Sequence, residues 1–141
     1  MSFFDQLGAL FAKYDVLGAF WVNIQLTFWA AIGSFVLGAI LALMRISPVP
    51  SLRWAGTIYV HLFRNTPLTI LMTLALLGVW TQFQLSFSTD FETNFFVYAV
   101  IVLSIYHASF VCEAIRSGVN TVPTGQAEAA RAIGLGFMDT A

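Results

Sequence analysis

The sequence contains few charged side chains. Six basic and seven acidic residues make up 9% of its 141 positions, and the formal net charge at pH 7 is −1. Soluble globular domains average about 25% charged residues, so water is not expected to be the main solvent of this chain. The six basic residues are also scattered, which leaves no basic patch of the kind that neutralises phosphates. These deficits favour a membrane protein and exclude a nucleic-acid partner.

Residues that carry metal, redox or catalytic chemistry are equally scarce. Cys112 is the single cysteine, and neither His61 nor His107 lies near it in the sequence. No disulfide framework and no zinc-ligand spacing can be written from these residues. The chain also lacks a glycine-rich phosphate loop and a nucleophile with a matching base and orienting group. We therefore expect no metal, no cofactor and no catalytic residue in this chain.

Apolar residues, by contrast, form long runs. They account for 59% of the chain, with 14 phenylalanines and a mean hydropathy of +0.83. No charged residue occurs in residues 16–44, 65–89 or 93–112. A helix that crosses roughly 30 Å of hydrocarbon needs about 20 apolar residues, and each run supplies that number. The pattern predicts an all-α polytopic membrane bundle, a single domain over residues 1–141, with spans at residues 16–44, 67–89 and 93–112.

Basic residues in the short loops indicate the side of the membrane on which each loop lies. Residues 45–66 hold three arginines and no acidic residue, whereas the turn after the second span holds two acidic residues and no basic one. The residues concerned are Arg45, Arg53 and Arg64 in the first loop, and Asp90 and Glu92 in the second. Because cytoplasmic loops carry an excess of Lys and Arg, residues 45–66 and 113–141 are predicted to be cytoplasmic and the N-terminus external.

Residues 1–15 are predicted to form a short external helix that lies on the bilayer surface. Apolar residues recur there at helical spacing, namely Phe3, Phe4, Leu7, Leu10 and Phe11. Asp5 and Lys13 fall elsewhere on the helical wheel, as in an interfacial amphipathic helix in contact with membrane lipid. A frayed terminus is the alternative. Because a basic segment followed by an apolar core is missing, a cleaved signal peptide is not expected.

Two proline-containing breaks separate the first span from the second. Pro48 and Pro50 are predicted to end the first helix, and Ser51 to cap an amphipathic helix in the cytoplasmic loop. The apolar residues near one face of that helix are Leu52, Ala55, Ile58, Tyr59 and Leu62. Thr66 followed by Pro67 predicts an N-cap and a first helical residue, so the second span restarts at Pro67. One long kinked helix is the alternative.

Small residues recur every four positions along the first span. They are Ala30, Ser34, Gly38 and Ala42. Such a stripe lets the backbone of another helix approach closely, so we predict that this face packs against a second helix. The alternative is the general abundance of Gly and Ala in membrane helices.

Polar residues within the second and third spans are candidates for function. Asn65, Thr69 and Thr73 share one face at four-residue spacing, which predicts either the lining of a translocation path or hydrogen bonds to neighbouring helices. His107 is the one titratable side chain well inside a span. A polar group at that depth requires a partner, so a neutral, hydrogen-bonded imidazole is predicted.

A short helix is predicted within residues 113–141. Thr124 is expected to cap it, with Glu128 in its first turn, Arg131 in its last turn and Gly134 at its end. A helix shorter than roughly 12 residues is marginal alone, and this one is rich in alanine. Docking into a groove of a partner protein explains both features, whereas a solvated helix is the alternative.

The same segment carries a family resemblance. Glu128-Ala129-Ala130 followed by Gly134 resembles the EAA loop of permease subunits in ATP-driven importers. Three further features resemble the polar amino acid branch, above all the glutamate-type permeases, and the resemblance runs from Phe20 onward. They are Arg64-Asn65-Thr66-Pro67-Leu68, Glu113 with Arg116, and Pro123 with Gly125-Gln126. Asn65 departs from the pattern, because many relatives have glycine there.

The resemblance implies a type I ABC importer permease fold in a bacterial cytoplasmic membrane. The implied coupling helix seats in a cleft of a cytoplasmic ATP-binding subunit, which hydrolyses the ATP. Its residues are Gly125, Gln126, Ala127, Glu128, Ala129, Ala130, Arg131 and Gly134. A second permease subunit, identical or homologous, and an extracytoplasmic substrate-binding protein are the other implied partners. Because permeases of this family continue into further helices, the chain is expected to be an N-terminal part.

Two other functions remain open from the residues alone. A non-transporting membrane adaptor would use the spans only to display a docking helix, and it would not accumulate substrate at the expense of ATP. A small proton-coupled carrier would depend on His107 and would transport without an ATPase, but no buried carboxylate or histidine relay supports it.

Overall fold

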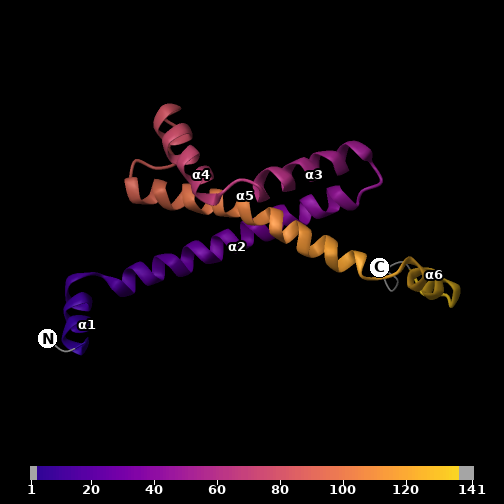
Figure 1. The fold of residues 1–141 in the computed structure, drawn as a ribbon, viewed down its shortest axis with the longest axis horizontal. Helices are drawn as coiled ribbons and strands as arrows, with labels where there is room; N and C mark the ends of the chain where they lie inside the picture. Colours follow the sequence, from indigo (N-terminus) through magenta and orange to yellow (C-terminus); the bar gives the residue numbers. More distant parts are fainter. Residues whose placement is uncertain (1–2, 137–141) are drawn as a thin grey trace.

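The computed structural model describes residues 3–136, and all regular secondary structure in that range is helical (Figure 1). In chain order the elements are α1 (Phe3–Lys13), α2 (Val16–Ile46), α3 (Pro50–Arg64), α4 (Leu68–Thr73), the π-helical segment η1 (Leu74–Gln82), α5 (Phe91–Asn120) and α6 (Thr124–Ala132). The predicted all-α class is confirmed. A helix is also found in the region predicted to lie on the bilayer, and the aromatic side chains of α1 are exposed there.

Helices α2 and α5 form the frame of the molecule and cross each other (Figure 1). They contain 31 and 30 residues, and both are long and apolar enough to cross a membrane. The carboxylates of Asp15 and Asp90 accept hydrogen bonds from the first turn of α2 and α5, respectively. Hydrogen bonds from the hydroxyl and amide of Thr93 lower the pKa of Asp90. Helix α2 ends at Ile46, before the two prolines, as predicted.

The second span predicted at residues 67–89 is not one helix. Its helical part comprises the six residues of α4 and the nine of η1, which together fall short of the roughly 20 residues that a span requires. Helix α3 and the α4–η1 segment are bent by 97° relative to each other, and they reach the length of a span only as a pair. The described chain therefore has two helices able to cross a membrane singly, and a third span if the bent pair counts as one.

Pro67 explains the bend. It has no backbone N–H to donate to α3, and its extended backbone (φ −60°, ψ 137°) precedes the first helical residue, Leu68. The predicted break is confirmed, but the predicted N-cap at Thr66 is wrong. The Thr66 hydroxyl instead donates back to the Leu62 carbonyl in the last turn of α3, at 2.8 Å.

Helix α3 packs through two small residues and through Tyr59, one of the five residues predicted to lie near its apolar face. Its buried residues are Gly56 and Val60, whereas the apolar side chains of Leu52, Ile58 and Leu62 are exposed. Glycine at position 56 brings the α3 backbone close to α2, where a Cβ would lie 2.8 Å from Arg45 Cγ. The small face therefore packs on α2, and the apolar face points outward. The predicted Ser51 cap is also wrong, because Val49 holds the N-cap position and Pro50 begins the helix.

The small-residue stripe on α2 is confirmed as a packing surface. Ala30, Ser34, Gly38 and Ala42 are all buried. A Cβ at Gly38 would lie 2.9 Å from the Ala108 carbonyl oxygen of α5, which is closer than real side chains approach. The core lies where α2, α3 and α5 meet, and its residues are Leu41, Ala42, Val60, Ala108 and Cys112.

Large apolar side chains cover the outside of the bundle. Those exposed on α2 include Phe20, Trp21, Phe28, Trp29, Phe35 and Leu43. Monomeric soluble proteins rarely expose contiguous apolar surface of this kind, whereas hydrocarbon solvates it. The small residues thus face protein, and the large ones are left to contact lipid.

Side chains of α5 hold the loop between η1 and α5, a feature that the sequence analysis missed. The buried Asn94 side chain accepts hydrogen bonds from the amides of Phe87 and Ser88, at 2.7 and 3.0 Å. The Tyr98 hydroxyl donates to the Leu85 carbonyl at 2.6 Å. These bonds attach the far end of the α4–η1 segment to the first half of α5.

We predict that Gly38→Leu weakens the contact between α2 and α5, because the new side chain meets the Ala108 carbonyl and Val111. Overpacking of this kind costs about 1–3 kcal/mol. Gly78→Leu is the control, since nothing lies within 4 Å of a Cβ at Gly78. The thermal unfolding midpoints of the two purified variants measure the effect, and equal midpoints would contradict the assigned packing.

Candidate functional site

Helix α6 is the predicted docking helix, and it is nine residues long as expected. Its start differs from the prediction by one position. Pro123 occupies the N-cap position with an extended backbone, so Thr124 is the first helical residue rather than the cap. Glu128 consequently lies in the second turn and not in the first, while Arg131 lies in the last turn as predicted. The rigid φ of proline and its missing N–H account for this shift.

Gly134 ends α6 as predicted. Its φ of +88° is a conformation that side-chain-bearing residues rarely adopt. The Gly134 amide donates to the Arg131 carbonyl at 3.0 Å, and the Leu135 amide donates to the Ala130 carbonyl at 3.1 Å. This pair of bonds is the Schellman motif, which satisfies the last carbonyls of a helix.

The predicted coupling residues lie together on α6 and its cap. Gln126, Glu128, Ala129 and Arg131 are exposed, and Ala127 and Ala130 are half-buried. Gly125 and Gly134 are also exposed. Helix α6 lies beyond the C-terminal end of α5, away from the crossing of α2 and α5 (Figure 1). The described chain therefore leaves most of this small-residue surface open to another protein.

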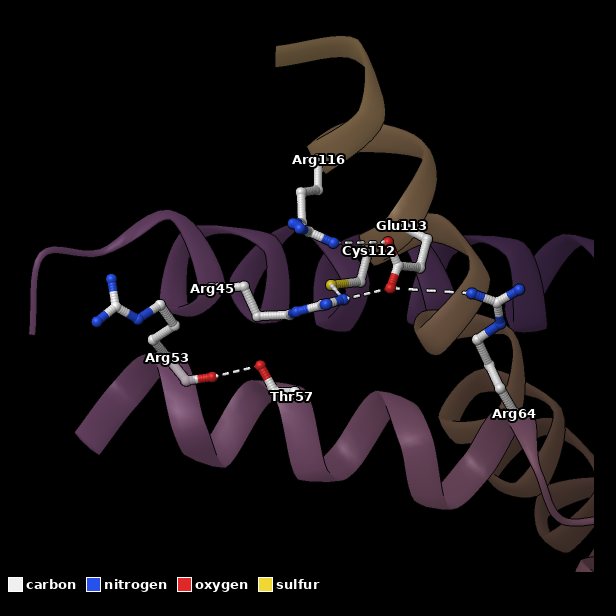
Figure 2. Close-up of polar contacts among 7 residues, drawn as sticks. All are labelled: Arg45, Arg53, Thr57, Arg64, Cys112, Glu113 and Arg116. Carbon is white, nitrogen blue, oxygen red and sulfur yellow. Dashed lines mark hydrogen bonds and ion pairs between the residues drawn. The ribbon is translucent and has the colours of Figure 1, made fainter. Parts of the chain in front are cut away.

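A cluster of charged side chains lies seven residues before the end of α5, and Glu113 is its centre. Its Oε1 lies 2.5 Å from Arg45 Nη1 on α2 and 3.8 Å from Arg64 Nη1 at the end of α3. Its Oε2 lies 3.3 Å from Arg116 Nη1, one turn further along α5. Figure 2 shows the three guanidinium groups approaching the same carboxylate, whereas Arg53 points away from it. We call these four residues, Arg45, Arg64, Glu113 and Arg116, the Glu113 cluster.

The Glu113 cluster connects three helices above the apolar core. The Arg45 side chain is only 7% exposed, and its Nη1 also lies 3.9 Å from the Sγ of the fully buried Cys112. Helix α3 is attached a second time, because the Tyr59 hydroxyl donates to the Ile105 carbonyl of α5 at 2.8 Å. Charge pairing, hydrogen bonding and packing thus join the ends of α2 and α3 to the part of α5 that leads to α6.

The sequence pattern does not predict this cluster. Arg45 and Arg64 indicate only the orientation of the loops, and Glu113 is associated with Arg116 only through the family resemblance. One signal was present: Arg45, Arg64 and Glu113 each border an uncharged run on the same predicted side of the membrane, and Arg116 follows Glu113 by three residues. Glu113 is the acidic residue among those basic neighbours, so pairing would have been a reasonable expectation.

The three candidate path residues, Asn65, Thr69 and Thr73, are all exposed. The Thr73 hydroxyl donates to the Thr69 carbonyl of its own helix at 2.8 Å. None of the three side chains donates to or accepts from a neighbouring helix within the described residues, so this part of the chain does not realise the packing alternative. Thr69 and Thr73 line a shallow hollow of about 250 Å³ on α4.

His107 has a hydrogen-bond partner, as predicted for an imidazole within a span. Its Nδ1 lies 2.9 Å from the Leu103 carbonyl oxygen, so Nδ1 is the donor of this bond. Residues 3–136 contain no group of three or more His, Cys, Asp or Glu side chains able to hold a metal ion. Within the described residues, the hydrogen bond of the His107 side chain is made to its own helix.

Comparison with known proteins identifies the class of this membrane protein. The family described as "Binding-protein-dependent transport system inner membrane component" matches residues 11–140. The chain belongs to this family, which agrees with the resemblance found in its EAA-type segment.

Particular relatives are transport permeases for amino acids. The chain is 48% identical over 130 residues to "Glutamate transport system permease protein GluC" of Corynebacterium efficiens, covering 89% of this chain and 57% of the relative. It is 34% identical over 141 residues to "Glutamate/aspartate import permease protein GltJ" of Escherichia coli, covering 90% of this chain and 56% of the relative. It therefore spans little more than half the length of these curated relatives.

A solved structure is similar in fold as well as in sequence. It is described as the crystal structure of an amino acid ABC transporter with histidines. The TM-score is 0.67 at 29% identity, and the match covers 82% of this chain and 51% of that chain. The helices described above are thus consistent with part of a type I importer permease.

We predict that Glu113→Gln destabilises the protein, because it leaves the nearly buried Arg45 beside two other guanidinium groups without a carboxylate. Removing one partner of a buried, hydrogen-bonded charge pair costs about 2–5 kcal/mol. Glu113 is partly exposed, so the lower end of that range is expected. Thermal unfolding of purified protein measures the loss, with Glu92→Gln at the opposite end of α5 as the control. Equal midpoints for the two variants would show that the cluster contributes nothing.

Proposed function

We propose that this chain is the permease subunit, or part of it, of an ATP-binding-cassette importer for polar amino acids, with glutamate or a similar amino acid as substrate. The observation that carries the proposal is the exposed EAA-type helix α6, which follows α5 after a linker of only three residues. Family membership and the two amino acid permeases described above support it. The chain itself is not catalytic, and a partner ATPase hydrolyses the ATP.

In this proposal α6 docks into a groove of the cytoplasmic ATP-binding subunit. Its exposed residues are small or polar, which suits a helix that packs closely in a groove and pairs its polar groups with the partner. The Schellman cap fixes the C-terminal end of a helix that is too short to be stable alone. A second permease subunit and an extracytoplasmic substrate-binding protein complete the complex.

The Glu113 cluster gives α6 a mechanical connection to the membrane helices. Helix α5 is continuous from Phe91 to Asn120, and Glu113 ties it to α2 and α3. A displacement of α6 by the ATPase therefore moves α5, and α5 carries the ends of the other two helices with it. Thr69 and Thr73 share a face of α4, and Asn65 ends α3 on the other side of the Pro67 bend. We assign these three residues to the translocation path.

The orientation in the membrane follows from the positions of the charges. The Glu113 cluster and Arg53 lie at the α6 end of the bundle, whereas Asp90 and Glu92 lie at the start of α5. Because arginine-rich ends face the cytoplasm, this arrangement supports a cytoplasmic α6 and an external N-terminus.

We predict that Glu128→Arg reduces ATP-driven uptake by about tenfold or more, because a like-charge contact at a docking surface costs several kcal/mol. Three quantities are measured with the full-length protein: the amount of protein in the membrane, its association with the ATPase, and the uptake of substrate. Glu92→Arg is the matched control, since it makes the same charge change at the opposite end of α5. Normal association with normal uptake in Glu128→Arg would show that α6 is not the docking helix.

We predict that an impermeant thiol reagent labels Ser86→Cys in intact cells but labels Ser51→Cys only after the membrane is opened. Both positions are exposed, so access depends on the side of the membrane alone. The native thiol does not interfere, because Cys112 is fully buried. The reverse labelling pattern would overturn the proposed orientation while leaving the family assignment intact.

A further inference from the structure

The charges of the Glu113 cluster do not balance. Three guanidinium groups share one carboxylate, which leaves a formal charge of +2 on four neighbouring side chains. No other carboxylate forms an ion pair with these arginines within the described part of the chain. A surplus of this size next to apolar helices attracts an anion.

Two of the three arginines have donors to spare. Arg45 is nearly buried and donates to Glu113 and Cys112. The side chains of Arg64 and Arg116 are 46% and 42% exposed. Arg64 donates no hydrogen bond to any described residue, and its Nη1 lies 3.8 Å from the Glu113 carboxylate. Because a guanidinium carries five N–H donors in a planar fork, Arg64 and Arg116 are able to bind oxygen atoms of a further anion.

Exposed apolar surface lies directly beside Arg64. Its guanidinium carbon is 5.5 Å from the centre of the Phe110 ring, and the Phe110 side chain is 41% exposed. The uncharged residues 65–89 begin immediately after Arg64, so the guanidinium lies at the boundary of the hydrocarbon. A small soluble anion cannot cover this apolar surface, whereas the hydrocarbon part of an amphiphile removes it from water.

We propose that Arg64 and Arg116 bind the phosphate of an anionic phospholipid. The headgroup phosphate accepts hydrogen bonds from these two partly exposed guanidinium groups, and an acyl chain lies along the exposed ring of Phe110 beside Arg64. Basic pockets between membrane helices are established sites for anionic headgroups. That the lipid belongs to the inner leaflet rests on the orientation given under the proposed function, but the site itself does not. The competing occupant is the carboxylate of a transported amino acid.

Native mass spectrometry of the full-length protein tests the proposal, with phosphatidylglycerol and phosphatidylcholine as the competing probe lipids. Wild-type protein is expected to retain phosphatidylglycerol in preference to phosphatidylcholine. Arg64→Gln and Arg116→Gln should each weaken that retention about fivefold, as expected for the loss of one basic residue near a lipid surface. Arg53→Gln is the matched control, because Arg53 lies on the same helix as Arg64 and points away from Glu113 (Figure 2). Its retention should equal that of the wild type.

Four outcomes decide the matter. Equal losses in Arg53→Gln and Arg64→Gln would mean diffuse attraction, and unchanged retention in Arg64→Gln would remove the site; either result overturns the proposal. Release of phosphatidylglycerol by added glutamate would assign the arginines to the substrate and also overturn it. Arg64→Lys keeps the positive charge but loses the planar guanidinium, and it serves as a second variant in case Arg64→Gln does not fold. Partial retention of phosphatidylglycerol by Arg64→Lys supports the proposal. The experiment contains neither ATPase nor ATP, and failure of the proposed transport function would therefore leave its result unchanged.

Discussion

The structure depends most on one shared carboxylate. Glu113 on α5 forms ion pairs with arginines of α2 and α3, and the buried core of Leu41, Val60 and Cys112 lies beneath these pairs. Hydrocarbon offers nothing to solvate Arg45, so the arginine must be paired where the helix leaves the membrane. This requirement fixes how far α5 extends beside α2 and where α3 returns to the bundle. Close backbone approach at Gly38 and Gly56 then becomes possible, because the ends of the three helices are already aligned.

Packing and solvation divide the surface of each helix in the same way. Small side chains face protein, because lipid tails are as apolar as leucine and give no drive to bury large ones against another helix. The prediction for α2 used this rule and was right. For α3 the sequence places Leu52, Ile58 and Leu62 near one apolar face, and the structure leaves these three side chains exposed while it buries Gly56 and Val60. The same rule, applied to α3, selects Gly56 as a packing position.

The features best predicted from the sequence are those that the hydrocarbon of the bilayer imposes on the chain. Charges cannot lie inside the bilayer, so the ends of α2 and the start of α5 were predicted closely from charge positions alone. Proline without an N–H predicted a break at residues 65–67, but neither the 97° size of the bend nor the π-helical geometry of η1 could be read from the sequence pattern. The helix α6 and its C-terminal cap at Gly134 were predicted. Its first residue differs by one position from the prediction because Pro123 takes the N-cap position. The Glu113 cluster joins residues far apart in the sequence, so no local pattern specifies its pairing.

Asn94 and Tyr98 of α5 hold the loop that follows the α4–η1 segment, and this restricts how the segment can move. The α4–η1 segment starts at the Pro67 bend, beside α3, and α3 is held to α5 by the hydrogen bond from Tyr59 to Ile105. The far end of the segment is held to α5 by the hydrogen bond from Tyr98 to Leu85 and by the stacking of Trp80 on Tyr98. Rotation about Pro67 alone therefore cannot swing the segment outward, because the far end of the segment is also held to α5. A movement of α5 is therefore transmitted to the segment through these contacts.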